Sequence, residues 1–415
     1  MNRIIFFFLA LGLCVQAMAQ GVVTLSGQVF DKQTGEPLRA ASVTLQGSSL
    51  SIVTNSEGVF SFKIPADSKG YITVSYLGYL TAEYQISDFG DSQLRIPMIP
   101  YAIQLEAAKV SAHDAYALVA SALMRVRDNY PTEHVGMTAF YRELIRKGNV
   151  KYIVLNEAVI DIDKAPYASV VADKAAIYKG RGNLNYDKTD SLAVNFQGGI
   201  VSALNYDQMQ DPFAGVPIRD LEDTYDFSLE PPVLMDDKLF QVVHFDQKPG
   251  GDDILYRGRV FIESESLAIA RVELSVNVEG REERAAGLFV LRQPVDLRTY
   301  VNRAEVVMNY KEFDGKWYYD YIRMTLDLST RRRRSLFRTN YYITGEMAVT
   351  DHRDGRPVVI ENTDRVRFRD VLSQKVSAFT DTDFWGDYNV IEPDQDINAI
   401  IRRIIRQLNR RRESQ

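Results

Sequence analysis

Residues 26–47 read SGQVFDKQTGEPLRAASVTLQG, in which a strand-like stretch is followed by a turn and a second strand-like stretch. The turn is built on four residues, Thr34, Gly35, Glu36 and Pro37. Glycine tolerates the positive φ that turns need, and proline presets its own φ where the chain reverses. Short alternating stretches separated by turn residues continue to Pro100. The pattern predicts a small antiparallel β-sandwich at the front of the chain.

The sandwich also carries a family resemblance. The residues that carry it are Gly27, Asp31, Gly35, Pro37, Ala41, Val43, Thr54, Gly58, Phe60, Gly78 and Tyr79. They resemble the carboxypeptidase regulatory-like domain, a prealbumin-like seven-stranded sandwich. In that family the domain is an accessory module of peptidases, outer-membrane receptors and other envelope proteins. The resemblance therefore implies a fold for residues 20–100 and no activity.

Residues 1–19 have the layout of a secretory signal peptide: Arg3, an apolar stretch, and Ala-Met-Ala ahead of Gln20. Cleavage there removes Cys14, the one cysteine, so the mature chain is expected to lack disulfides and thiol chemistry. Leu13 disfavours lipid attachment at Cys14, because a small residue is expected before a lipidated cysteine. We therefore expect an exported protein in the periplasm or at the outer-membrane periphery.

The formal charge argues against a nucleic-acid partner. Lys and Arg number 49 and Asp and Glu number 55, a net charge of −6. Nucleic acid is a poor partner for an acidic chain. An envelope protein or a lipid is the expected partner. No later stretch has the roughly 18 uncharged apolar residues that a membrane-spanning helix requires.

A larger antiparallel sheet is predicted after a connector at 101–113. It is expected to span residues 114–393 and to start with an amphipathic helix, DAYALVASALMRVRDNYP, capped by Asp114. Strict alternation in AIARVELSVNV, residues 268–278, indicates a strand with one dry face. Gly250-Gly251-Asp252 and Asp314-Gly315 indicate hairpin turns. The predicted fold is mainly β, with residues 394–415 as a basic amphipathic C-terminal helix.

The sheet domain is similar in pattern to the curved half-barrel of periplasmic lipoprotein carriers, in which a sheet wraps around a helix and an acyl-binding cavity. Three stretches, TAFYRE, LAIARVE and DFWGDYNVIEP, resemble motifs of a domain that accompanies the regulatory-like module in envelope proteins. Neither resemblance implies a catalytic mechanism.

Catalytic motifs do not stand out. The histidines are His113, His134, His244 and His352, and none belongs to an H-E-x-x-H pattern. No G-x-S-x-G nucleophile elbow is present either. We therefore expect no enzyme activity and no cofactor, and a hydrolase with an unrecognised site stays an alternative.

The stretch with the clearest metal-binding pattern resembles an EF-hand calcium loop. In DTDFWGDYNVIE, the acids that match an EF-hand are Asp381, Asp383, Asp387 and Glu392. Trp385 occupies position 5, where an oxygen ligand is required, so we expect a structural turn rather than a metal site.

Four consecutive arginines, Arg331, Arg332, Arg333 and Arg334, are the candidate anion-binding residues. Guanidinium groups match phosphate geometry, although such a run is also typical of a solvated hairpin end. The expected function is a non-catalytic envelope binding or assembly protein. A periplasmic lipid or lipoprotein carrier that uses the concave sheet is the alternative. The C-terminal helix is expected to dock on the sheet, with an anionic membrane as its competing surface.

Overall fold

The computed structural model describes residues 21–101, 112–148, 151–167, 169–182, 195–196, 199–251, 253–379 and 384–413. The predicted signal peptide and most of the connector at 101–113 lie outside the described residues. Within the described residues, no helix is both long and apolar enough to cross a membrane.

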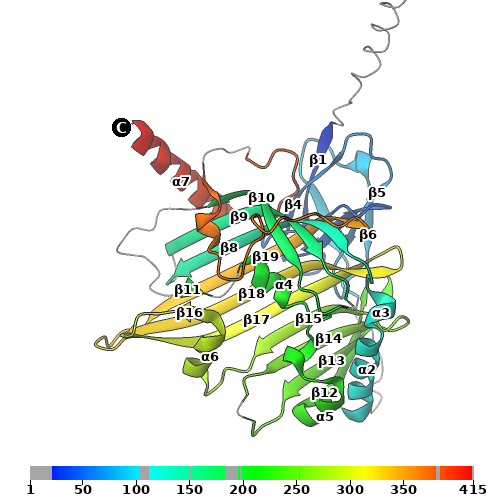
Figure 1. Ribbon diagram of the computed structural model, residues 1–415. Helices are drawn as coiled ribbons and strands as arrows, with labels where there is room; N and C mark the ends of the chain where they lie inside the picture. Colours follow the sequence, from blue (N-terminus) through cyan, green and yellow to red (C-terminus); the bar gives the residue numbers. More distant parts are fainter. Residues whose placement is uncertain are drawn as a thin grey trace, which may run out of the picture.

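The N-terminal strands form the predicted seven-stranded sandwich (Figure 1). One sheet has the order β4-β1-β7 and the other β3-β2-β5-β6. The strands are β1 (Val22–Asp31), β2 (Ser42–Leu45), β3 (Ser51–Val53), β4 (Val59–Pro65), β5 (Tyr71–Ser75), β6 (Ala82–Gln85) and β7 (Leu94–Met98). The sandwich is not wholly antiparallel: β7 pairs parallel to β1, because the chain crosses from the second sheet back to the first.

The turn in the opening stretch forms as its residues predict. The Asp31 carboxylate accepts hydrogen bonds from the backbone N–H groups of Gln33 and Thr34, at 2.6 and 2.9 Å. Gly35 has a φ of 77°, which glycine adopts at little cost. The Tyr79 hydroxyl donates to the other Asp31 oxygen at 2.7 Å and ties the turn to the connection between β5 and β6.

The larger part of the chain is an open sheet with the order β12-β13-β14-β15-β17-β18-β19-β8-β9-β10-β20. Its strands are β8 (Val135–Lys147), β9 (Lys151–Lys164), β10 (Lys174–Gly182), β12 (Tyr225–Met235), β13 (Lys238–Gln247), β14 (Tyr256–Glu263), β15 (Ile269–Val276), β17 (Leu297–Phe313), β18 (Lys316–Arg332), β19 (Thr339–Asp354) and β20 (Ser377–Ala378). Every pairing is antiparallel except that of β20 with β10. A two-stranded sheet of β11 (Asn195–Phe196) and β16 (Val290–Arg292) lies beside it. The fold is therefore mainly β, as predicted.

The Asp314-Gly315 signal identifies a real turn, whereas Asp252 of the Gly250-Gly251-Asp252 signal lies outside the described residues. Asp314 and Gly315 have φ values of 49° and 75° and join β17 to β18. Alternation in β15 also holds, with Val272, Leu274 and Val276 buried. Ile269 is buried as well, because a register shift opposite it, between Phe261 and Ile262, locally breaks the two-residue period.

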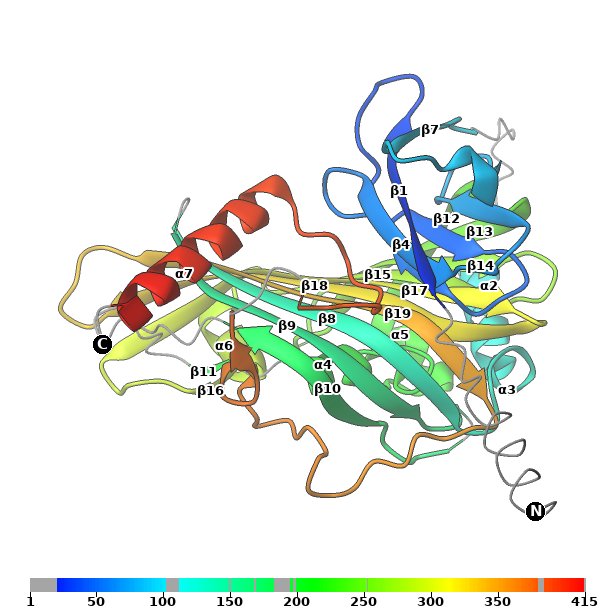
Figure 2. The same ribbon diagram turned by 90° about the horizontal axis from the view of Figure 1, so that it is seen from above.

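The helices within residues 112–289 and the sandwich cover opposite faces of this sheet (Figure 2). We call the face packed against the helices the inner face; its apolar cluster includes Ala139, Tyr141 and Met308. The helices there are α2 (Ala112–Met124), α3 (Val126–Asn129), α4 (Ile200–Asn205), α5 (Leu221–Thr224) and α6 (Glu282–Phe289). Asp114 lies in the first turn of α2 rather than capping it, because the helix begins at Ala112. Its carboxylate there still complements the helix dipole.

The N-terminal sandwich packs on the opposite, outer face. Val53 of β3 joins an apolar cluster with Phe140, Tyr321 and Trp385. The Ser49 hydroxyl donates to the Asp351 carboxylate at 2.6 Å across the same boundary. Apolar and polar contacts together therefore hold the sandwich against the sheet.

The C-terminal helix α7 (Gln395–Glu413) also lies on the outer face (Figures 1 and 2). Ile397, Ile401 and Ile404 are buried against Leu155 and Phe379. The helix docks on the sheet domain as its sequence predicted, because its apolar stripe finds a surface there.

Candidate ligand-binding cavity

A cavity of about 520 Å³ lies on the inner face of the sheet. Strands β8, β17, β18 and β19 form its floor, and α4 and the segment 366–375 form its walls. The Val366 N–H donates to the Ala175 carbonyl of β10 at 2.8 Å, which fixes one wall to the sheet. A cavity in this size range is typical of small-molecule sites.

The floor is apolar because alternate residues of each strand face inward. Tyr141 of β8, Val306 of β17, Met324 of β18 and Ile343 of β19 all line it. Gly345 leaves room among them: a β-carbon there would lie 2.8 Å from Met324 Cε and 3.1 Å from Tyr141 Oη. Glycine at this position therefore leaves room for these two side chains on the floor.

Glu143 is one of four carboxyl groups among the described residues that line the cavity, with Asp211, Glu305 and Asp370. Glu143 lies two residues after Tyr141, so both side chains lie on the same face of β8. Burial raises the pKa of Glu143, although hydrogen bonds with Asn156 and Tyr141 lower it. Asn156 Nδ2 lies 3.3 Å from Glu143 Oε1. The group is therefore neutral over a wider pH range than an exposed glutamate, and can donate as well as accept a hydrogen bond.

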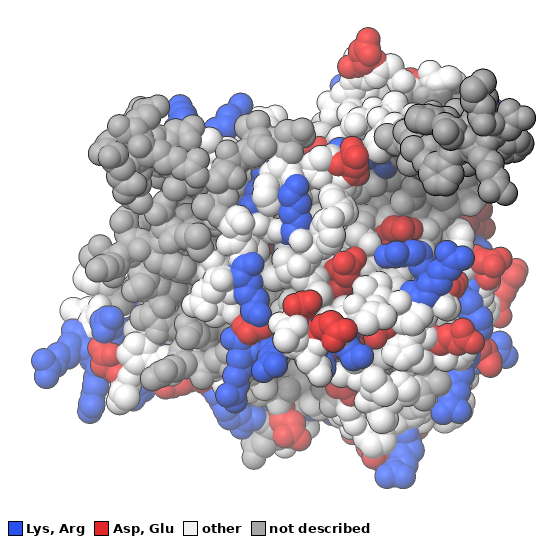
Figure 3. Space-filling view, turned by 45° about the horizontal axis from the view of Figure 1, so that its top comes forward, with Lys and Arg blue, Asp and Glu red and all other residues white. Residues whose placement is uncertain are grey.

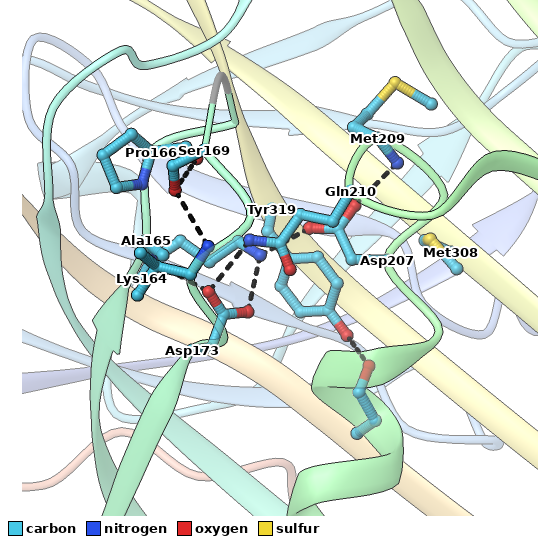
Figure 4. Close-up of polar contacts among 12 residues, drawn as sticks. Lys164, Ala165, Pro166, Ser169, Asp173, Asp207, Met209, Gln210, Met308 and Tyr319 are labelled. Carbon is cyan, nitrogen blue, oxygen red and sulfur yellow. Dashed lines mark hydrogen bonds and ion pairs between the residues drawn. The ribbon is translucent and has the colours of Figure 1, made fainter. Parts of the chain in front are cut away.

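The wall at α4 is held by a buried ion cluster (Figure 4). Lys164 is 0% exposed, and its Nζ lies 2.7 Å from Asp173 Oδ2 and 2.7 Å from Asp207 Oδ2. Asp207 follows α4 and accepts further hydrogen bonds from the Tyr310 hydroxyl at 2.6 Å and the Met209 N–H at 3.0 Å. Burial opposes the positive charge of Lys164, but the two carboxylates outweigh it and raise the pKa of the ammonium group.

A tyrosine of the sheet adds a second anchor for α4. The Tyr319 hydroxyl donates to the Ala203 carbonyl at 2.8 Å (Figure 4). Gly199 precedes the helix with a φ of 78°, and its added β-carbon would lie 4.0 Å from Glu143 Oε2. The ion cluster and Tyr319 thus set the distance between α4 and the cavity floor.

A second buried ion cluster lies on the outer face. Glu157 Oε1 accepts from Arg142 and Oε2 from Arg181, each at 2.8 Å. Burial raises the pKa of Glu157, but the two arginines outweigh it and the net shift is downward. Arg142 also donates to the Ile391 carbonyl at 2.7 Å, which ties the chain before α7 to the sheet. This cluster is a structural tie on the opposite side of β8 from the cavity floor, because Arg142 lies between Tyr141 and Glu143 in that strand.

The arginine run lies away from the cavity. Arg331 and Arg332 end β18, and Arg333 and Arg334 form the turn that follows. None of the four is among the described residues that line the cavity. Arg332 pairs with Asp296 at 2.6 Å at an exposed position.

The calcium-loop residues are only partly described. Asp381 and Asp383 lie outside the described residues, Asp387 is exposed, and Glu392 is half-buried. Trp385 packs edge-on against Phe140 with ring centroids 5.5 Å apart, as expected for a turn pinned to the core. Among the described residues no group of three or more His, Cys, Asp or Glu side chains is arranged to hold a metal.

The histidines lie in separate places. His113 Nδ1 lies 3.0 Å from Glu222, and His134 Nδ1 lies 2.8 Å from Asp163. His352 stacks on Tyr318 with ring centroids 4.2 Å apart. His244 lies in β13. The structure does not bring the four together.

Sequence patterns did not identify the residues that shape the cavity. Glu143 ends the TAFYRE stretch, and strand alternation places it on the same face as Tyr141. Lys164, Asp173 and Asp207 carried no local signal, because they come from different elements and meet only in the folded chain.

Comparison with known protein families identifies the first domain. No curated protein matches the chain. The crystal structure of a DUF1329 family protein from Desulfovibrio piger ATCC 29098 shares 12% sequence identity and a TM-score of 0.26, and the match covers 61% of this chain and 98% of that one. That TM-score is too low to define a shared fold. Residues 25–110 match the family described as CarboxypepD_reg-like domain, and the N-terminal sandwich is such a domain.

Proposed function

We propose that the chain is a non-catalytic binding protein of the cell envelope whose sheet domain holds an apolar or amphipathic ligand, such as a lipid acyl chain. The observation that carries the proposal is the cavity of about 520 Å³ on the inner face. The signal-peptide pattern at residues 1–19 and the envelope context of the regulatory-like domain support the location.

The lining suits a ligand with an apolar body and a small polar group. Tyr141, Val306, Met324 and Ile343 offer apolar contact along the floor. Glu143 offers a polar group on the floor, and the charged side chains of Asp211, Arg367, Arg369 and Lys375 also line the cavity. Binding sites of this kind use such polar groups to orient a ligand. Such a cavity supports a carrier role, because an acyl chain gains free energy by leaving water for this surface.

Filling the cavity tests the proposal. A leucine side chain at position 345 would lie between Met324 and Tyr141. Its β-carbon would contact Met324 Cε, which is the flexible end of a side chain and can move aside. Gly345→Leu should weaken binding of a fluorescent fatty-acid probe to the purified chain by at least about tenfold, a loss of about 1.4 kcal/mol. Gly90→Leu is the matched control, because a β-carbon at Gly90 meets no atom within 4 Å.

Glu143→Gln tests the polar group without changing the volume. Its thermal melting curve checks that the chain folds. A probe with a polar head should lose affinity in this variant, whereas a plain hydrocarbon probe should not. Equal probe affinity in the wild-type chain, Gly345→Leu and Gly90→Leu would show that the cavity is not the binding site.

A further inference from the structure

The turn between β18 and β19 exposes two large apolar side chains. Residues 333–338 read RRSLFR, and Leu336 is 93% and Phe337 84% exposed. Apolar residues that protrude side by side from a soluble domain are often part of an interaction site. The β18–β19 hairpin extends beyond the rest of the sheet in two views (Figures 1 and 2).

A neighbouring loop adds a third exposed apolar residue. Val295, just before β17, is 106% exposed. The Arg333 N–H donates to the Asp296 carbonyl at 2.8 Å, and Leu297 pairs with Arg332, so the two loops lie together at one end of the sheet. We call Val295, Leu336 and Phe337 the apolar tip.

The apolar tip is surrounded by positive charge, in contrast to the acidic chain as a whole. Segments 293–297 and 331–338 together hold five arginines and one acid, Asp296. Arg338 lies over the Tyr300 ring, with its Cζ 4.3 Å from the ring centroid. Figure 3 shows basic side chains gathered at this end of the molecule, at the left of the view.

We propose that the apolar tip docks the protein on an anionic lipid bilayer, with Leu336 and Phe337 inserted among the lipids and the arginines on the headgroup phosphates. Guanidinium forks match phosphate oxygens, and apolar side chains beside them gain from partial burial in the acyl region. A protruding hairpin end offers little of the roughly 1,200 Å² or more that a stable protein interface buries, whereas a bilayer needs only a few inserted side chains.

The proposal is independent of what the cavity binds. It gives the candidate anion-binding run, Arg331 to Arg334, a partner of stated chemistry. It also assigns membrane contact to the sheet end rather than to α7, whose apolar stripe is already buried on the sheet.

Vesicle binding by the mature chain, residues 20–415, tests the proposal. The wild-type chain should sediment with phosphatidylcholine vesicles that contain phosphatidylglycerol, and not with vesicles of phosphatidylcholine alone. Raising the salt concentration should weaken binding, because it screens the arginines. Arg333→Glu with Arg334→Glu should weaken it by at least about tenfold, since each basic residue near an anionic surface contributes about fivefold.

Leu336→Ser with Phe337→Ser should also weaken binding by about tenfold or more, since both residues would lose their apolar burial. Lys32→Glu with Lys69→Glu is the matched control for charge, because both lysines are exposed on the N-terminal sandwich. Val359→Ser, at a residue that is 84% exposed elsewhere, is the control for apolar loss. Both controls should bind as the wild-type chain does.

A fluorescent probe reports insertion directly. The chain has one cysteine, Cys14, which is absent from residues 20–415, so Phe337→Cys carries a single thiol for an environment-sensitive dye. The dye emission should shift to shorter wavelength with anionic vesicles and be quenched by brominated acyl chains. Unchanged binding in both tip variants, equal binding to neutral vesicles, or an unshifted dye would each overturn the proposal. If the wild-type chain forms a dimer, and the tip variants lose that dimer but keep vesicle binding, the apolar tip contacts a second copy of the chain instead.

Discussion

Replacing Lys164 with methionine should destabilise the sheet domain strongly. The side chain is 0% exposed, and its Nζ lies 2.7 Å from a carboxylate oxygen of both Asp173 and Asp207. Methionine keeps much of the length and apolar body of lysine but removes the charge. Lys164→Met therefore leaves two buried carboxylates without their cation.

The expected cost is about 3–5 kcal/mol, the usual range when one partner of a buried ion pair is removed. Tyr310 still donates to Asp207, which moderates the cost. A surface ion pair is worth about 1 kcal/mol or less, so Lys248→Met is the matched control. Lys248 is 40% exposed and lies 3.9 Å from Asp226, which is 72% exposed.

Urea unfolding followed by tryptophan fluorescence measures the effect. Both tryptophans belong to the sheet domain. Trp317 lies in the apolar cluster of the inner face, and Trp385 lies in that of the outer face. The combined variant Lys164→Met, Asp173→Asn and Asp207→Asn should recover much of the lost stability, because it removes the whole ion cluster rather than one partner.

A loss of less than about 1 kcal/mol in Lys164→Met would refute the reasoning, since it would place the cluster in the range of a surface pair. A combined variant as unstable as the single one would also refute it, because the cost would then come from packing rather than from uncompensated charge.

Two further predictions concern the outer face. Burial raises the pKa of Asp320 to about 6, while Lys311 lowers it and Asp236 raises it. The folded chain then binds more protons than the unfolded chain between pH 4 and pH 6, so this group's contribution to stability falls as pH rises, by at most about 3 kcal/mol. Urea unfolding of Asp320→Asn should lack that fall, and a wild-type pH profile parallel to that of the variant would contradict the assignment. Deleting residues 395–415 should lower the melting temperature in calorimetry by several degrees, because Ile397, Ile401 and Ile404 lose their burial on the sheet. Vesicle binding should persist in the deletion, and an unchanged melting temperature with lost vesicle binding would instead make α7 the membrane anchor.

Local patterns in the sequence predicted most of the strands and turns. Asp314 and Gly315 form a turn because both adopt a positive φ that these residue types tolerate, which depends on the two residues alone. Alternation in 268–278 predicted which side chains of β15 face the core. It was wrong at Ile269, where an irregularity in the pairing with β14 decides the outcome.

The cavity could not be predicted from the sequence and was identified only in the folded chain. Tyr141 and Glu143 share a face of β8 by alternation, yet that pattern does not reveal that Gly345 of a neighbouring strand leaves space beside them. The side of the sheet that the sandwich covers was also undetermined, because both faces carry apolar residues.

The sequence by itself determined the mainly β fold, the regulatory-like sandwich and the amphipathic character of the C-terminal helix, because each depends on residues close together in the chain. Only the tertiary structure decided that Lys164 meets Asp173 and Asp207, that α4 bounds a cavity, and that Leu336 and Phe337 are exposed beside Val295. Those features depend on which strands pair and which face each helix covers, and pairing between distant segments leaves no periodic signal in either segment.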